Sequence, residues 1–450
     1  ASFTGSFAAS AVVGVSTFIA QSALVFTPVT TIDICDTEVY HDGVAATWNG
    51  GDIRLDHGAH YHEGVNGTFN ITSNGTLSYP ALGAQSGFIN AGVIRKSAGT
   101  GVTFFNGVDL DNTGTVQVEA GTFRADRPVQ VSGSTLTGGR WKVMGGSSLD
   151  LVGAAITTNR GDVTLDGATS SFAAINGLTT NDTAGSLSVQ NGRDFTTTSA
   201  PGSDFTNNGQ ITVGAGSTFQ VDPANHLTNY NTGTGALTGG HLAVSGTFKF
   251  PSADIQTLAA DVTLSGPTSA IVNTAGANGL ANLATVAPTG ALSIQNGRNF
   301  QTGGNFTVAE VGADKGSLSI GPGTLFRVAP GSTLTNFASN EITLGGFNIA
   351  GRLQFDGAAI NSVNTQIVLS GPGPHIINEL GIDAFLNLNT IKPAGDLGVK
   401  EGQHLMLGGT LALIIAAKVQ VPFYPVPMTL QTLAVMAIAV PLGLRLGVPT

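Results

Sequence analysis

The chain has 450 residues, of which 63 are glycine and only 46 are charged, and its formal net charge is −10 at pH 7. Because it has no basic stripe to neutralise phosphates, it is not expected to bind nucleic acid. Hydrophobic residues make up 41% of the chain, enough for a continuous core, and the single cysteine, Cys35, permits no intramolecular disulfide.

Residues 1–44 are predicted to form an apolar N-terminal segment and cap. No charged residue precedes Asp33, and the stretch 7–26 is apolar enough to suggest a signal or membrane-spanning segment. It has no basic flank and is interrupted by Ser, Thr, Gly and Gln, so we expect the cap or first coil of a mature chain, with a spanning helix as the alternative. Ile32 and Ile34 then alternate with polar neighbours, as in a first strand.

A cluster of residues that could bind a metal ion or take part in catalysis follows the cap. It contains four histidines and three acids: His41, Asp42, Asp56, His57, His60, His62 and Glu63. On a strand, His60 and His62 would point to one face, and with His57 they could offer three imidazoles to a zinc-like ion. Their spacing matches no known zinc motif, so the alternative is a set of solvated loop and strand residues. The sequence predicts no catalytic residue and no cofactor, and it leaves these three histidines as metal candidates only.

Residues 45–160 are predicted to form irregular coils of short strands and turns, and they include an Asp-x-Asp pair, Asp109 and Asp111. In a β-helical polysaccharide lyase such acids would hold calcium beside a basic residue, and in a glycosidase two carboxylates would flank the bond. Three later acids are candidates of the same kind: Asp150, Asp162 and Asp166. The alternative is turn residues and a solvated face, because the sequence shows no cluster of several carboxylates with Arg or Lys on neighbouring strands.

From residue 161 onward the chain repeats itself. The sequence of residues Gly185–Phe195 recurs, with few changes, as Gly290–Phe300, 105 residues later, and a third copy of the repeat begins at Gln366. Self-similarity at a fixed period indicates a stacked architecture. The resulting divisions are repeat 1 (161–260), repeat 2 (261–365), a partial repeat 3 (366–404) and an apolar tail (405–450).

The repeats consist of short alternating strands, such as 291–295 and 317–320, that end at Asn-Gly, Gly-Pro-Gly or Gly-Gly. This alternation indicates β-structure throughout, and the near absence of helical spacing excludes parallel strands linked by helices. We therefore predict an all-β, right-handed parallel β-helix in which each repeat of about 105 residues makes four or five coils of about 20 to 25 residues. Equivalent inward positions should then be stacked and buried. Two such pairs are Leu187 with Leu292 and Val189 with Ile294.

The repeated phrases resemble a known group of proteins. They include Ala215-Gly-Ser-Thr-Phe219, Leu227-Thr-Asn229, Leu237-Thr-Gly-Gly240 and the stretch 88–97. They resemble the Gly/Thr/Asn-rich β-helical repeats of large bacterial surface proteins, the autotransporter passenger and filamentous-haemagglutinin-like group. The resemblance covers about residues 45–405 and brings no catalytic motif. It implies a secreted or surface-displayed stalk, adhesin or assembly subunit.

The tail, residues 405–450, differs from the rest of the chain. Its part from about 412 to 447 resembles the N-terminal region of the BioY family, whose members are membrane-embedded biotin-binding components of vitamin uptake transporters. The remainder of such a protein is absent, so no biotin site is carried over, and a fusion, a shifted reading of the gene or an uncertain sequence assignment would each explain the match. The tail is expected either to contact a membrane or to pack as an apolar arm. We favour packing, because three prolines and Lys418 make a poor bilayer element.

These features together predict a non-enzymatic extracellular or cell-surface β-helix with a structural or adhesive role, for example a subunit of a surface or filamentous assembly. Its expected partners are other copies of itself or neighbouring surface proteins, with glycans as a further class. One alternative is a polysaccharide lyase or glycosidase on the same scaffold. Another is an ice- or glycan-binding face, which would require outward threonines to align from coil to coil.

Overall fold

The computed structural model describes residues 2–3, 16–20, 23–27, 30–43, 45–373, 375–401, 420–421 and 428–429. In this part of the chain, parallel strands stack into a β-solenoid of about 15 turns, and the helices are two short 3-10 turns, η1 (Ala173–Ile175) and η2 (Ala384–Asn387). The predicted parallel β-helix is confirmed. Residues 4–15 of the predicted cap and most of the tail 405–450 lie outside the described residues.

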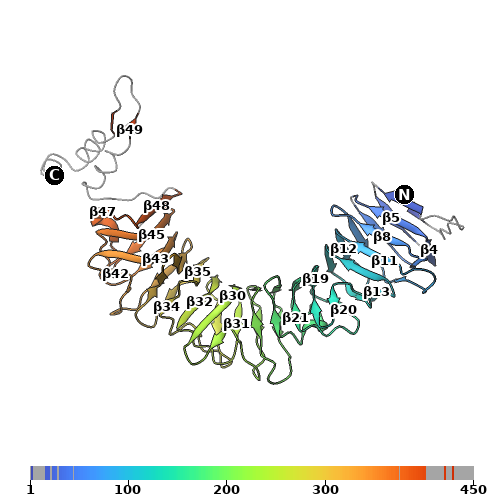
Figure 1. Ribbon diagram of the computed structural model, residues 1–450, viewed down its shortest axis with the longest axis horizontal. Helices are drawn as coiled ribbons and strands as arrows, with labels where there is room; N and C mark the ends of the chain where they lie inside the picture. The colour runs from blue at the N-terminus through green and yellow to red at the C-terminus, as the bar shows by residue number, and fades with distance from the viewer. Residues whose placement is uncertain are drawn as a thin grey trace. The chain divides into compact units, whose positions relative to one another are not determined.

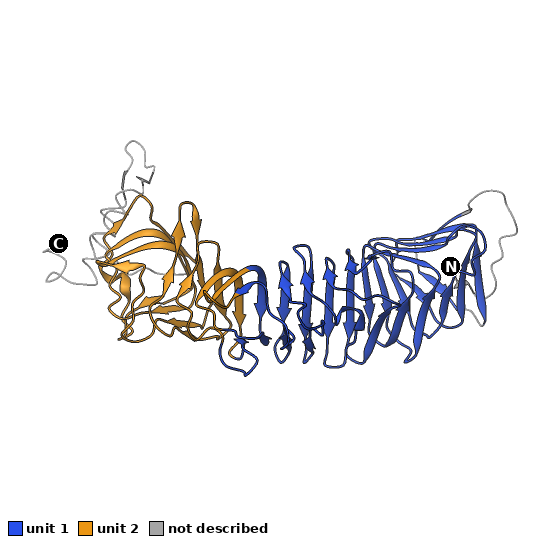
Figure 2. Ribbon diagram, turned by 60° about the horizontal axis from the view of Figure 1, so that its bottom comes forward, with its two compact units in different colours: residues 1–230, 239–253, 268–278 blue, residues 231–238, 254–267, 279–450 orange. Residues whose placement is uncertain are grey.

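The chain divides into two compact units, which Figure 2 shows in different colours. Unit 1 contains residues 1–230, 239–253 and 268–278, and unit 2 contains residues 231–238, 254–267 and 279–450. The two units therefore interleave between residues 231 and 278, whereas the repeated text restarts at about residue 261. The boundaries of the two compact units therefore do not coincide with those of the sequence repeats.

The first coils of unit 1 contribute one strand to each of three parallel sheets (Figure 1, blue to cyan). The first sheet contains β2 (Ser16–Ala20), β5 (Thr37–His41), β8 (His60–Glu63), β11 (Gly87–Asn90) and β14 (Asp109–Asn112). The second contains β1 (Ser2–Phe3), β3 (Leu24–Phe26), β6 (Ala46–Trp48), β9 (Thr68–Ile71), β12 (Val93–Lys96), β15 (Thr115–Val118), β19 (Arg140–Met144), β22 (Asp162–Asp166), β24 (Ser186–Gln190) and β27 (Gln210–Val213). The third contains β4 (Thr31–Cys35), β7 (Asp52–Asp56), β10 (Thr76–Ser78), β13 (Val102–Asn106), β16 (Gly121–Ala125) and β20 (Ser147–Leu151).

The later coils of unit 1 keep the second sheet and replace the other two with sheets of shorter strands. One contains β17 (Val131–Ser132), β18 (Thr135–Leu136), β21 (Thr158–Asn159), β23 (Thr180–Asn181) and β26 (Thr206–Asn207). The other contains β25 (Asp194–Thr196), β28 (Thr218–Gln220), β31 (Thr247–Lys249) and β33 (Ala270–Val272). Two further strands of the same region are β29 (Tyr230–Asn231) and β30 (Ala236–Val244).

Unit 2 is built on the same plan. The larger sheet contains β32 (Thr257–Ser265), β34 (Thr285–Val286), β35 (Ala291–Gln295), β37 (Thr307–Val308), β40 (Ser317–Ile320), β42 (Phe337–Ala338), β43 (Glu341–Ile349), β45 (Ser362–Ser370), β47 (Thr390–Ile391) and β48 (Asp396–Lys400). The smaller one contains β36 (Phe300–Gln301), β41 (Leu325–Arg327), β44 (Arg352–Gln354) and β46 (Ile376–Ile377). Three described pairs of unit 2 are antiparallel: β42 with β43 in the larger sheet, β38 (Glu310–Val311) with β39 (Asp314–Lys315), and β49 (Gln420–Val421) with β50 (Met428–Thr429).

The register of unit 2 explains the repeat length. Asp261 pairs with Ala291, Ala291 with Ser317, Ser317 with Gly346, and Gly346 with Gln366, where the third copy of the text begins. One repeat therefore spans four coils, within the predicted four or five, but three of these coils, with 30, 26 and 29 residues, are longer than the predicted 20 to 25. The coils differ in length because their turns absorb insertions, while the paired strands keep the register.

Side chains that alternate along each strand form the core. All four predicted inward residues, Leu187, Val189, Leu292 and Ile294, are at most 1% exposed. In the first coils the core is aromatic: Tyr61 stacks on Phe88 at a ring-centroid distance of 4.7 Å, and Phe105 lies 4.9 Å from Phe123. Because every coil places its apolar residues at the same register, each layer of the core is covered by its neighbours.

Buried asparagines form a ladder along one corner of unit 1. Asn159 Nδ2 donates to Asn181 Oδ1 at 2.9 Å, and Asn181 Nδ2 donates to Asn207 Oδ1 at the same distance. Each amide also donates to a backbone carbonyl of the coil above, for example Asn181 to the oxygen of Gln210. The ladder therefore satisfies polar groups that the corner would otherwise bury without partners.

The repeated Asn-Gly texts form equivalent left-handed turns. Asn191 has φ 55° and Asn296 has φ 54°, and the glycines that follow them, Gly192 and Gly297, have φ 82° and 78°. Asparagine and glycine tolerate this conformation better than other residues. The Asn-Gly pairs of the sequence thus lie at the corners of the coils.

Candidate functional site

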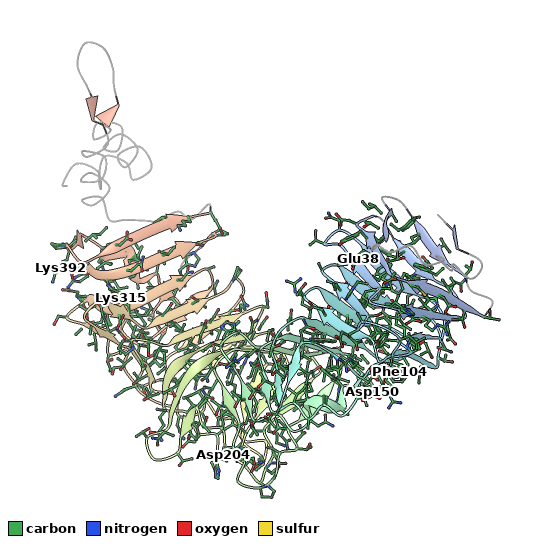
Figure 3. All side chains as sticks on the ribbon, turned by 45° about the vertical axis from the view of Figure 1, so that its right-hand side comes forward. Glu38, Phe104, Asp150, Asp204, Lys315 and Lys392 are labelled. Carbon is green, nitrogen blue, oxygen red and sulfur yellow. The ribbon has the colours of Figure 1, made fainter. Side chains whose placement is uncertain are left out.

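The outward side of the first sheet brings Glu38 of β5 beside two histidines of β8. The Glu38 carboxylate accepts hydrogen bonds from His60 Nδ1 at 3.1 Å and from His62 Nε2 at 2.5 Å. The ring of Tyr40 stacks on that of His62, with centroids 4.2 Å apart. Figure 3 labels Glu38 on the coils of this end of unit 1. His60 and His62 therefore lie on one face, as predicted, and a single carboxylate engages both imidazoles.

His57 belongs to a different group. It follows the end of β7, where Asp56 lies in register with Cys35 of β4. The ligand atoms of Cys35, Asp56 and His57 all lie within 4.8 Å of one another, and within the described residues no other group of three or more His, Cys, Asp or Glu is so close. The three predicted metal candidates are thus divided between two groups, because His57 lies in a turn and the other two histidines lie on β8.

The inward side of the same coils buries a polar set, His41, Tyr61 and Glu63. His41 Nδ1 lies 2.8 Å from Glu63 Oε1, and the Tyr61 hydroxyl donates to Glu63 Oε2 at 3.1 Å. Burial raises the pKa of Glu63 to about 8 and that of Tyr61 well above its usual value, and it lowers the pKa of His41. These residues are enclosed by the aromatic core and are closed to a substrate.

A groove of about 490 Å³ in unit 1 is lined by two carboxylates and a guanidinium, those of Asp109, Asp126 and Arg127. Arg127 Nε donates to Asp109 Oδ1 at 2.5 Å, an interaction that raises the pKa of Arg127. Asp126 accepts a hydrogen bond from the N–H of Gly107 at 2.8 Å. The structure thus brings two carboxylates and one arginine together where the sequence showed no such cluster, because Asp126 and Arg127 follow β16 and lie one coil beyond Asp109.

The other predicted acids have partners on adjacent coils. Asp111 accepts from Gln130 Nε2 at 2.6 Å, and Asp166 accepts from Asn191 Nδ2 at the same distance. Asp162 lies 3.7 Å from Arg140 Nε. These acids hold coils together and line no common groove.

Asp150 takes part in a short outward row on the third sheet. Phe104, Arg124 and Asp150 occupy one register position of three successive coils. The Arg124 guanidinium lies 4.9 Å from the centre of the Phe104 ring, and its Nε lies 3.2 Å from Asp150 Oδ2. Figure 3 labels the first and last members of the row near each other on the outer side of unit 1.

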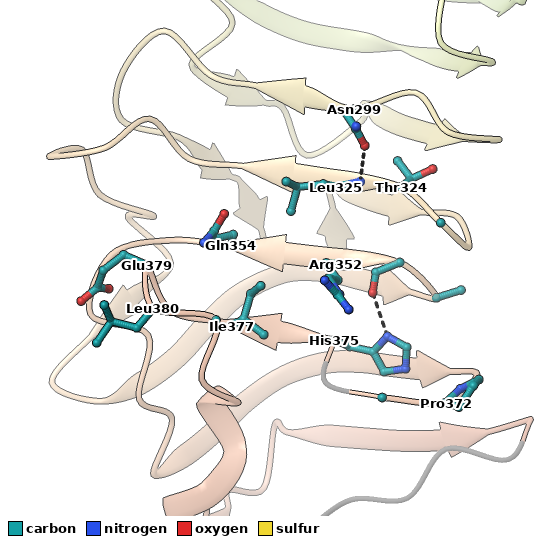
Figure 4. A pocket seen from close by; sticks show the side chains of 15 residues that line it. Asn299, Thr324, Leu325, Arg352, Gln354, Pro372, His375, Ile377, Glu379 and Leu380 are labelled. Carbon is teal, nitrogen blue, oxygen red and sulfur yellow. Dashed lines mark hydrogen bonds between the residues drawn. The ribbon is translucent and has the colours of Figure 1, made fainter.

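Unit 2 has a larger groove, of about 690 Å³, beside β41, β44 and β46 (Figure 4). Arg352, Gln354 and Glu379 are among its polar side chains, and Leu380, which is 76% exposed, is among its apolar ones. The buried His375 is held by two carbonyls, those of Gly351 at 2.8 Å and Gly371 at 3.0 Å. The imidazole therefore supports the floor of the groove.

Outward threonines align in both units. In unit 1, Thr135, Thr158, Thr180 and Thr206 occupy one register position, and the Thr228 hydroxyl lies 2.7 Å from that of Thr206. In unit 2, Thr257, Thr285 and Thr307 share a register position, and the Thr335 hydroxyl lies 2.6 Å from that of Thr307. Beside the ladder of unit 1, Arg160 pairs with Asp182 at 2.6 Å. Each ladder is therefore a single row of hydroxyl groups.

Two features of these sites were missed at the sequence level. Cys35 was considered only as a disulfide partner, although it lies 21 positions before Asp56, close to one coil length. Arg127 was not paired with Asp109 for the same reason: residues 18 positions apart become neighbours only when the coil length at that point is known. Residues separated by about one coil are the signal that could have found both.

The chain was compared with protein families, with curated proteins and with solved structures. A model of the BioY family matches residues 395–450, which are 56 of the 450 residues. The match begins within the solenoid, since β48 (Asp396–Lys400) pairs with β45. Among the described residues, no helix has the length and apolar character needed to cross a bilayer. Searches of curated proteins and of solved structures returned no match. The chain is therefore similar to the BioY family over its C-terminal stretch alone.

Proposed function

We propose that the protein is a non-enzymatic structural or adhesive β-solenoid of the cell exterior. The observation that carries this proposal is the way in which the charged side chains of unit 1 are paired. Its arginine–carboxylate pairs join neighbouring coils: Arg54–Asp33, Arg95–Glu119, Arg124–Asp150, Arg127–Asp109, Arg140–Asp162 and Arg160–Asp182. Pairs of this kind are worth about 0 to 1 kcal/mol each. Distributed along the stack, they hold adjacent coils together and leave few charges for a concentrated reaction centre.

Two further features support an extracellular role and an adhesive surface. The repeat phrasing resembles that of autotransporter passengers and filamentous-haemagglutinin-like proteins, which implies display outside the cell. The threonine ladders and the open groove of unit 2 offer hydroxyl, amide and guanidinium groups without a deep cavity. Such surfaces suit shallow contacts with glycans, with neighbouring surface proteins or with other copies of the chain.

A polysaccharide-active enzyme is the second candidate, and the groove of Asp109, Asp126 and Arg127 favours it. Carboxylates beside a guanidinium are the groups that a lyase or glycosidase would use. We rank this candidate lower because the Asp109 carboxylate is already paired with Arg127 and Asp126 accepts a backbone N–H.

One experiment separates the two proposals. The full chain is incubated with neutral and acidic polysaccharides, with and without Ca²⁺, alongside the variants Asp109→Asn and Arg127→Ala. Asp150→Asn serves as the matched control, because Asp150 is also an arginine-paired surface acid but lies outside the groove. We expect binding without cleavage by all four proteins. Cleavage by the wild type and the control that is lost in Asp109→Asn would overturn the structural proposal and establish the enzyme.

A further inference from the structure

The ends of two adjacent strands bring three different metal-ligating side chains together. Cys35 ends β4, Asp56 ends β7, and the two residues are paired in register. His57 follows with φ 52°, a left-handed conformation that is uncommon for residues other than glycine, although asparagine, aspartate and histidine adopt it more often than the rest. The ligand atoms of these three side chains lie within 4.8 Å of one another. The cluster therefore combines a thiol, an imidazole and a carboxylate at one corner of the coil.

Backbone contacts to the coils on either side fix this corner. The N–H of Asp36 donates to the carbonyl of Asp56 at 3.2 Å, and the N–H of His57 donates to the carbonyl of Leu82 at 3.0 Å. The same N–H lies 2.9 Å from Asp56 Oδ1, so the carboxylate is oriented as well. Gly83 leaves no room for a side chain, since an added Cβ would lie 2.9 Å from the Cα of His57. The ligand positions are thus held by the solenoid itself.

The local charge and exposure suit a cation. Besides Asp56, the acids Asp33 and Asp36 lie within two residues of Cys35 in the chain, and Arg54 is paired with Asp33 at 2.7 Å. Asp56 is buried, whereas the His57 side chain is 49% exposed and Cys35 is half-buried. A cation can therefore reach the cluster from solvent and be held against a buried carboxylate.

We propose that Cys35, Asp56 and His57 form a three-ligand site for a thiophilic divalent metal ion such as Zn²⁺, which links adjacent coils at the N-terminal end of the solenoid. Zn²⁺ binds sulfur at about 2.3 Å and nitrogen or oxygen at about 2.0 to 2.2 Å, so its ligands lie within about 4 Å of one another. Binding forms a metal–sulfur bond and releases the thiol proton to solvent. Three protein ligands leave one position for water.

The neighbouring group of Glu38, His60 and His62 provides the natural control. It offers two imidazoles and a carboxylate, but both oxygens of Glu38 already accept hydrogen bonds from the two rings. This group also contains no sulfur. A metal bound there would give no sulfur-dependent signal, so the two sites are distinguishable.

The test uses Co²⁺ as the probe, titrated into the reduced full chain. Cys35 is the only cysteine, so a sulfur-to-cobalt charge-transfer band in the near ultraviolet reports this residue alone. We expect one Co²⁺ per chain to produce the band and Zn²⁺ to displace it. Cys35→Ser should abolish the band, and Asp56→Asn and His57→Asn should weaken binding by about tenfold or more, the effect that even outer-shell changes produce. His57→Asn preserves the local turn, since asparagine tolerates the left-handed conformation of residue 57, and Asp56→Asn keeps the size and shape of the side chain.

The double variant His60→Ala/His62→Ala should keep the band unchanged. The proposal is overturned if the wild type gives no band, or if Asp56→Asn and His57→Asn bind Co²⁺ as the wild type does. A second readout is independent of colour: Zn²⁺ should slow alkylation of Cys35 by iodoacetamide in the wild type, and much less so in His57→Asn. Circular dichroism of each variant confirms that the solenoid remains folded.

Discussion

His41 Nδ1 and Glu63 Oε1 lie 2.8 Å apart in the core of the first coils, and both side chains are fully buried. The pair is not a conventional ion pair. Burial raises the pKa of Glu63 to about 8 and lowers that of His41, so near neutral pH the two groups share a hydrogen bond between neutral partners. A buried ion pair without compensating contacts would cost more than this arrangement.

The raised pKa of Glu63 predicts that the first coils lose stability as the pH rises. Between about pH 4.5, its ordinary pKa, and about pH 8, the folded protein holds a proton that the unfolded chain releases. The contribution of Glu63 is therefore most favourable below this window and is lost as pH approaches 8. Thermal unfolding followed by tryptophan fluorescence, from the buried Trp48 and Trp141, should show a falling midpoint between about pH 6.5 and pH 8, because below about pH 6.5 the lowered pKa of His41 changes stability in the opposite direction.

Glu63→Gln provides the comparison, since its amide keeps an oxygen for the Tyr61 hydroxyl but does not titrate. We expect a flatter dependence on pH for this variant. Glu119→Gln is the matched control, because hydrogen bonding to Arg95 lowers the pKa of that surface carboxylate. Identical pH profiles for the wild type and Glu63→Gln would contradict the assignment of the slope to Glu63.

The stacked apolar layers predict equal losses at equivalent positions of the two repeats. Leu187 in unit 1 and Leu292 in unit 2 are each 1% exposed. Truncation of a buried leucine to alanine costs about 2 to 5 kcal/mol, so Leu187→Ala and Leu292→Ala should both lower the unfolding midpoint and increase protease sensitivity. Ser293→Ala, at the adjacent outward position, should change little. A Leu292→Ala protein as stable as the wild type would contradict the buried position of the Leu292 side chain.

The asparagine ladder predicts a different kind of loss. Asn181 accepts from Asn159 and donates to Asn207 and to the carbonyl of Gln210, so Asn181→Ala leaves buried polar groups on both sides without partners. Each such group costs about 1 to 3 kcal/mol. Hydrogen exchange should then increase in the strands above and below the substitution. Asn208→Ala, one residue past the next member of the ladder and exposed, is the control and should leave exchange unchanged.

The sequence predicted the fold and its repeat well because both depend on local patterns. The alternation of apolar and polar residues along the strands was enough to predict that Leu187 and Ile294 are buried. The Asn-Gly pairs were enough to predict the turns. Neither prediction requires knowledge of which strands are neighbours. The sites depend on that knowledge. Cys35 meets Asp56, and Asp109 meets Arg127, only because the coil lengths at those points are near 21 and 18 residues. Turn insertions vary these lengths, so a period averaged over the chain does not identify the pairs.

The last parallel strand described in unit 2, β48, leads to a prediction about the tail. Strand β48 pairs with β45 along one edge, and within the described residues its other edge has no partner strand. Nearby, Ile391 is 41% exposed and Val399 is 44% exposed. An open parallel edge with apolar neighbours is a site of association between chains unless it is covered. Residues 405–450 are close in sequence and apolar, and we expect them to cover this end.

A chain of residues 1–404 tests this expectation against the membrane alternative that the BioY match suggests. If the tail covers the end of the stack, its removal should make the protein associate in a concentration-dependent way in light scattering and lower its unfolding midpoint, while the full chain stays in solution with liposomes. If the tail is a membrane element, the shortened chain should be unchanged in stability and the full chain should bind the liposomes. Val399→Pro in the shortened chain distinguishes edge pairing from nonspecific association. The Lys400 carbonyl accepts from Gly371 on the β45 side, so the N–H of the preceding residue, Val399, points to the open edge, and proline lacks the N–H that a new strand needs. Association that persists unchanged in this variant would place the contact away from β48.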